Sequence, residues 1–185
     1  MAMEKAAPMD PETQAIVRAT EKYKDVKLAL ADGYMADPSG MCVVASMVGA
    51  QKQLGSMGIH YFRPDLLGIT GTEPRVNGTG MHTDFLKPAV LMYEPQADGS
   101  LVLVGIENLV WTKAWHDAGR QGRPTFRGNE YNYMIDNPLT PDVDEAHGFE
   151  AHYDLHWYLY RKNPHGEFME FNPAVSCEHG EHAMK

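Results

Sequence analysis

Two long runs of β-forming residues, joined by a turn sequence, constrain the fold of this chain more than any other feature. The runs are PAVLMYEP (88–95) and LVLVGIENLVW (101–111), and the segment QADGS lies between them. Asp98-Gly99 within that segment is a pair that favours a tight turn. The pattern therefore predicts an antiparallel β-hairpin.

The remaining segments predict one long helix and further strands. Asp10 followed by Pro11 is a helix start, and apolar residues recur at three- and four-residue spacing up to Gly33, which predicts a helix of about five turns. The other expected elements are a strand at 57–62, a glycine-rich loop at 68–80, a short helix at 112–119, an irregular stretch at 120–148 and a strand at 150–160. We expect an α+β fold, in which an N-terminal amphipathic helix accompanies an antiparallel β-sheet or a small β-barrel with long loops.

The length and charge of the chain limit its organisation and its partners. A chain of 185 residues fits one domain, which we place at 10–178, with 1–9 as a disordered leader or added residues and 179–185 as a flexible tail. The net charge of -9 argues against a nucleic-acid partner. No apolar run reaches the roughly 20 residues that a bilayer span needs, so we expect no membrane partner, and the oligomeric state is left open.

The chain has two cysteines, Cys42 and Cys177, near opposite ends of the predicted domain. They are either one disulfide that closes most of the domain or two unrelated buried thiols. A disulfide would favour a periplasmic or otherwise exported protein, and free thiols would favour the cytoplasm.

The segment EAHYDLHWYLY (150–160) alternates polar and apolar residues. On a β-strand this alternation places His152, Asp154 and His156 on one face and an apolar set on the other. On a helix the four-residue spacing would bring both histidines to one ion, but the aromatic residues would then surround most of the helix. We favour the strand. On it the two histidines lie roughly 13 Å apart, too far to share one metal ion unless the strand is bulged.

Glu107 is the second residue that suggests chemistry. On a strand it shares a face with Leu101, Leu103, Leu109 and Trp111, where an ionised carboxylate is costly unless it is paired, liganded or protonated. It would otherwise need to reach water at a sheet edge. His60 lies in the predicted strand at 57–62. If these strands are neighbours, His60 and Glu107 could meet a histidine of the last strand.

These residues predict a metal site. The candidate ligands are His60, Glu107, His152 and His156, a set suited to Zn²⁺, Fe, Mn or Cu. We expect only one of His152 and His156 to bind, and the other to act as an acid/base or to orient a ligand. Glu107 and His156 are the candidate catalytic residues. The residues expected to line a cofactor or substrate pocket are Tyr61, Tyr131, Trp157 and Tyr158.

Three motifs, MGIHYFRPDLL, the YEP turn leading into LVGIENLV, and HYDLHWYLYRKNPHGEFMEFNPAVSC, carry a resemblance. Together they resemble a family of small uncharacterised bacterial proteins, many of them exported, over roughly residues 20–177. The resemblance implies a cysteine before the Gly-Ile-His-Tyr segment and another that closes the domain, the places that Cys42 and Cys177 occupy. It implies no particular activity.

Three functions fit the sequence. The first is a metal-dependent small-molecule enzyme, an oxidoreductase or a lyase, with a mixed His/Glu site inside a small barrel. The second is a non-catalytic barrel that binds a small ligand or haem. The third is a metal-free lyase or isomerase that uses Glu107 and a histidine as acid and base.

Overall fold

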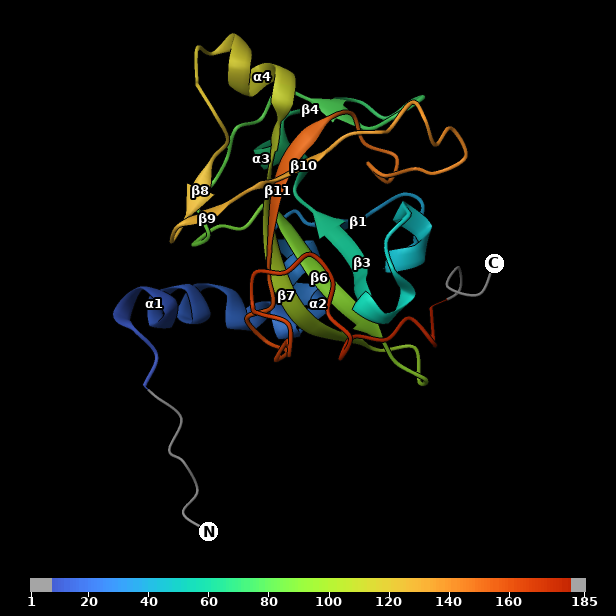
Figure 1. The fold of residues 1–185 in the computed structure, drawn as a ribbon. Coiled ribbons are helices and arrows are strands. Elements are labelled where there is room, and N and C mark those ends of the chain that lie inside the picture. The colour runs from blue at the N-terminus through green and yellow to red at the C-terminus, as the bar shows by residue number, and fades with distance from the viewer. Residues whose placement is uncertain (1–7, 181–185) are drawn as a thin grey trace.

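The computed structural model describes residues 8–180, and the core of the fold is one antiparallel sheet (Figure 1). Its strands run in the order β1-β3-β6-β7-β11-β10, and β2 pairs with β3 beside this path. The strand bounds are β1 Met35–Ala36, β2 Cys42–Val44, β3 Ser56–Phe62, β6 Val90–Pro95, β7 Leu101–Trp111, β10 Asn132–Met134 and β11 His152–Trp157. The α+β prediction is confirmed. The sheet is open, and no closed barrel forms within residues 8–180, so the barrel alternative is not what this chain adopts.

The predicted hairpin is confirmed as the centre of the sheet. Strands β6 and β7 pair in antiparallel fashion, and the intervening Gly99 has φ of +83°, a backbone conformation that glycine adopts without strain. Strand β7 then pairs with β11 on its other side. His152 and His156 therefore lie on a strand rather than a helix, which confirms the prediction.

The N-terminal helix is shorter than its periodicity predicted. It is divided into α1 (Pro11–Thr20), a 3-10 turn at Glu21–Lys24, and α2 (Val26–Ala31). Asp25 interrupts it, because its backbone is extended and its side chain caps α2 by accepting a hydrogen bond from the Lys27 N–H. The break still leaves Ile16, Tyr23 and Ala29 in one core with the sheet.

A β-bulge on β7 decides which side chains share the face of Glu107. Met92 pairs with Gly105 but Tyr93 pairs with Leu103, so Val104 has no partner of its own on β6. Leu103 therefore faces the helical side of the sheet, whereas Leu109 and Trp111 belong to the core on the Glu107 side. The expectation that Leu101 and Leu103 would share the face of Glu107 is thus wrong, because the extra residue reverses the alternation.

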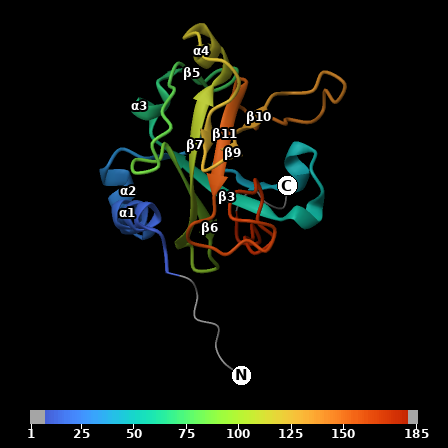
Figure 2. The same cartoon turned by 60° about the vertical axis from the view of Figure 1, so that its left-hand side comes forward.

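The two faces of the sheet are covered differently. Figure 2 shows α1 and α2 on one side, whereas the segment around 45–55 and the C-terminal segment lie on the other. Cys42 of β2 is joined to Cys177 by a disulfide with an S–S distance of 2.03 Å. The disulfide ties the C-terminal segment to β2.

The remaining elements are short and lie outside the central sheet. The stretch 120–148, expected to be irregular, contains three short strands, of which β10 joins the sheet. The short elements are the 3-10 turns Ala45–Val48 and Lys52–Leu54, helices α3 (Pro64–Leu67) and α4 (Thr112–Asp117), and strands β4 (Ile69–Gly71), β5 (Asn77–Gly78), β8 (Thr125–Phe126) and β9 (Asn129–Glu130). No helix among residues 8–180 is long and apolar enough to cross a membrane. The predicted leader and tail lie largely outside the described residues.

Candidate metal centre

Three strands bring His60, Glu107 and His156 together on the face opposite the helices. Glu107 of β7 is the direct cross-strand partner of His156 on β11. His60 of β3 pairs with Met92 of β6, the strand that separates β3 from β7. All three are buried, at 8%, 2% and 0% exposure respectively. Core packing of the strands on both faces therefore holds the three side chains in place.

The three side chains meet at one oxygen atom. Glu107 Oε2 lies 3.3 Å from His60 Nε2 and 3.4 Å from His156 Nε2. One ligand atom from each residue falls within 4.8 Å of the other two. None of these three atoms has a hydrogen-bond partner in residues 8–180. Buried polar atoms are nearly always satisfied, so this convergence of three unsatisfied atoms requires an explanation.

The spacing of these atoms fits metal ligands. Nitrogen-oxygen hydrogen bonds centre near 2.9 to 3.0 Å, shorter than both contacts. In a tetrahedral site with bonds of about 2.0 to 2.1 Å, neighbouring ligand atoms lie about 3.3 to 3.4 Å apart. The two contacts of Glu107 Oε2 have this spacing. Two imidazoles and one carboxylate would leave further coordination positions open.

Asp154 lies on the same face of β11, between the two histidines of that strand. It is fully buried, with Oδ2 3.3 Å from His152 Nε2 and Oδ1 3.8 Å from His156 Nδ1. Burial alone would raise the pKa of Asp154, but His156 and His152 more than offset it and lower that pKa below its ordinary value. Asp154 faces Nδ1 of His156, whereas Nε2 of the same ring faces Glu107.

His152 does not join the group of three. Its Nδ1 lies 2.8 Å from the carbonyl oxygen of Glu150, and its Nε2 faces Asp154. Of the four predicted ligands, the structure brings together His60, Glu107 and His156 and leaves His152 beside Asp154. The reason is the four-residue separation along a regular strand, which agrees with the expectation that only one of His152 and His156 would join the group.

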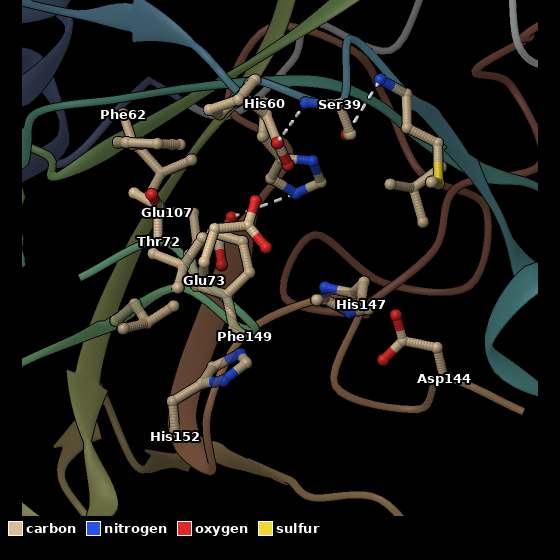
Figure 3. Close-up of a pocket in the computed structure, with 18 residues that line it drawn as sticks. Ser39, His60, Phe62, Thr72, Glu73, Glu107, Asp144, His147, Phe149 and His152 are labelled. Carbon is tan, nitrogen blue, oxygen red and sulfur yellow. Dashed lines mark hydrogen bonds and ion pairs between the residues drawn. The ribbon is translucent and has the colours of Figure 1, made fainter. Parts of the chain in front are cut away.

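A cavity of about 370 Å³ opens beside the cluster (Figure 3). His60, Glu107 and His152 line it, so an ion held by the cluster would be reachable from the cavity. Phe62 and Phe149 form an aromatic corner of its wall, with ring centroids 6.1 Å apart. The cavity joins a polar cluster to an apolar surface, as small-molecule sites do.

The four residues expected to line a pocket lie elsewhere. Tyr61, Tyr131 and Trp157 pack in the core on the helical side of the sheet, and none of the four lines the cavity. Tyr61 and Trp157 directly adjoin ligand candidates in sequence, and alternation along a strand sends such neighbours to the opposite face. Tyr158 is buried on the cluster side, where its hydroxyl donates a hydrogen bond to the Glu170 carbonyl oxygen.

Two further residues near the cluster, His147 and Glu170, are absent from the predicted site. The ring of His147 stacks over that of His60 at a centroid distance of 6.3 Å, and burial and the neighbouring His152 lower the pKa of His147 to about 3. Glu170 lies in the C-terminal segment, and burial and then the charges of Asp154 and Glu107 raise its pKa to about 8. Both come from irregular segments without periodicity, so neither could be placed from a pattern.

The fold and site define a class of protein: a disulfide-linked α+β domain with a buried His₂Glu cluster beside an apolar cavity. No protein-family model, curated protein or solved structure matches the chain in the comparisons made.

Proposed function

We propose that this protein is a metal-dependent enzyme acting on a small molecule, with the metal bound by His60 Nε2, Glu107 and His156 Nε2. The observation that carries the proposal is the convergence of three buried, unpartnered ligand atoms, with Glu107 Oε2 at tetrahedral spacing from both imidazole nitrogens. Without an ion, the fold would bear the cost of three unsatisfied polar atoms in its interior.

The donor set supports Zn²⁺ or Fe²⁺ first, with Mn²⁺ and Cu²⁺ as further candidates. Two histidines and one carboxylate form the protein ligands of several catalytic zinc sites and of many non-haem iron oxygenases. When bound, such an ion polarises a substrate oxygen or activates water or dioxygen. Sites that serve structure alone are usually closed by four protein ligands, whereas this set supplies three.

Asp154 would act as a positioning residue. A ligating histidine usually donates its second N–H to a carboxylate, which fixes the ring and raises its basicity. Asp154 is placed for this role toward His156, although the 3.8 Å separation would have to shorten. His152, on the other side of Asp154, would hold that carboxylate in turn.

A metal-free acid/base enzyme is the second candidate, because Glu107 lies between two imidazoles that could exchange a proton with it.

The haem alternative receives less support. No lysine or arginine is among the described residues that line the cavity, so nothing there would pair with the haem propionates. The disulfide supports export of the protein to an oxidising compartment.

Metal analysis of protein purified without an affinity tag tests the proposal. We expect close to one equivalent of transition metal per chain, either as purified or after reconstitution with Zn²⁺ or Fe²⁺. His60→Gln and His156→Gln should reduce the content below about a tenth of an equivalent, whereas His165→Gln, which changes an exposed histidine, should not. A wild-type protein that takes up no metal would rule out the metal-dependent enzyme and favour the acid/base candidate.

A further inference from the structure

Carboxylates outnumber basic side chains of every kind on the wall of the cavity. Asp37, Glu73, Glu107 and Asp144 line it, and neither lysine nor arginine does so among the described residues. Asp144 is neutralised in part, because it shares Arg75 with Asp136, at 2.7 and 2.6 Å. Glu73 has no ion-pair or hydrogen-bond partner within residues 8–180. Figure 3 labels Glu73 among the side chains that line the cavity.

Unpartnered atoms at the base of the cavity distinguish it from an ordinary acidic surface. The side chain of Glu107 is 3% exposed and lines the cavity, yet its Oε2 has no hydrogen-bond partner. His147 also lines the cavity, and its buried Nε2 is unpartnered too. Such atoms favour a ligand in this space.

The rest of the wall is apolar. Phe62 and Phe149 meet edge to face, with an interplanar angle of 85°, and Val76, Val90 and Leu109 continue the surface. An aliphatic or aromatic body would lose little by leaving water here, whereas a carboxylate or phosphate would lose its hydration beside the carboxylates of Asp37 and Glu73.

A bound divalent ion would not reverse this charge. It would bring two positive charges against the carboxylates of Glu107 and, directly behind His156, Asp154. Asp37 and Glu73 would then remain as uncompensated negative charges at the wall.

We infer that the cavity binds an organic cation, an ammonium group carried on an apolar or aromatic body, and discriminates against organic anions. The assignment of this cation as a substrate rests on the proposed metal-dependent function. Binding of the cation does not depend on that function, because the carboxylates and the apolar wall of the cavity belong to the chain itself.

Three probes with one phenylethyl body test the inference: 2-phenylethylamine, 2-phenylethanol and 3-phenylpropionate. Calorimetric titration into zinc-free and zinc-loaded protein should give about tenfold tighter binding of the amine than of the alcohol, and the weakest binding for the carboxylate. The preference for the amine should fall as salt is raised, since part of it is electrostatic attraction at a solvent-accessible wall.

Glu73→Gln should reduce the amine preference about threefold or more. Glu21→Gln, an equal change of charge on the exposed 3-10 turn after α1, should leave it unchanged. Carboxylate binding equal to or tighter than amine binding in either form of the protein would overturn the inference. So would absence of amine binding at millimolar concentration, or equal effects of the two substitutions.

Zinc content measured on the same samples separates the two proposals. Amine preference in a protein that takes up no metal would support the cation site and refute only the metal-dependent function. Stoichiometric zinc without amine preference would refute only the cation site.

Discussion

Replacing Glu107 by Gln should separate two effects of the buried carboxylate, namely its effect on the stability of the metal-free fold and its contribution to metal binding. Glu107 is 2% exposed, and its Oε2 has no hydrogen-bond partner. Leaving a buried polar atom unsatisfied costs about 1 to 3 kcal/mol, and more if it is charged. An amide of nearly the same shape removes the charge and can donate to an imidazole nitrogen. We therefore expect metal-free Glu107→Gln to be as stable as the metal-free wild type, or more stable by about 1 kcal/mol.

The metal should reverse this order of stability. A ligand present at a thousand times its dissociation constant stabilises the folded state by about 4 kcal/mol. For a chain of this size each kcal/mol raises the Tm by about 2 to 4 °C, so saturating zinc should raise the wild-type Tm by about 8 to 16 °C. Without its anionic ligand, Glu107→Gln should show little of this shift.

Differential scanning calorimetry with and without zinc, on wild type, Glu107→Gln and the surface control His165→Gln, measures both quantities. The control should show the wild-type shift. A Glu107→Gln protein that keeps the full zinc-dependent shift would show that Glu107 is not a ligand. A metal-free variant that is less stable than the wild type by more than about 2 kcal/mol would show that Glu107 stabilises the fold without an ion.

Three further predictions concern groups around the site. Asp154→Asn should weaken zinc binding by about 10- to 100-fold in a competition titration while the stoichiometry stays at one, and unchanged affinity would remove Asp154 from the orientation of His156. Replacing Cys42 and Cys177 together by Ser should lower the free energy of unfolding by about 5 kcal/mol in urea titrations, because the disulfide spans 135 residues; a loss under 1 kcal/mol would contradict the chain-entropy argument. The pKa of His147 is about 3 in the folded protein against an ordinary 6.5, so the unfolded chain takes up the proton first and stability falls as the pH drops from 6.5 toward 3. At pH 5 this loss approaches about 2 kcal/mol in metal-free protein, and His147→Gln should be less sensitive to acid by that amount; an identical pH dependence for both proteins would count against a neutral buried His147.

The centre of the fold could be predicted because its signals are local. Alternation in 150–160 and the Asp98-Gly99 turn each depend on neighbouring residues, and both appear in the structure as β11 and the β6-β7 hairpin. Glu107 could be selected from the sequence because a carboxylate in an apolar run is costly wherever the run packs.

The remaining features depend on contacts that no local pattern encodes. The bulge at Val104 arises in the pairing of two strands, and it reverses the facing of Leu103 relative to Glu107. His147 and Glu170 reach the site from irregular segments, where side-chain direction follows from the surrounding fold. Tyr61 and Trp157, which were expected in the pocket, adjoin His60 and His156 in sequence, and adjacent residues of a strand face opposite sides.

A crystal structure of zinc-reconstituted protein, with anomalous diffraction data collected on both sides of the zinc edge, would locate the metal. We expect one strong anomalous peak, about 2.0 to 2.2 Å from His60 Nε2, His156 Nε2 and a Glu107 oxygen, with its open side toward the cavity. No peak at this cluster in crystals grown with excess zinc, or a peak held by other residues, would contradict the proposed metal site.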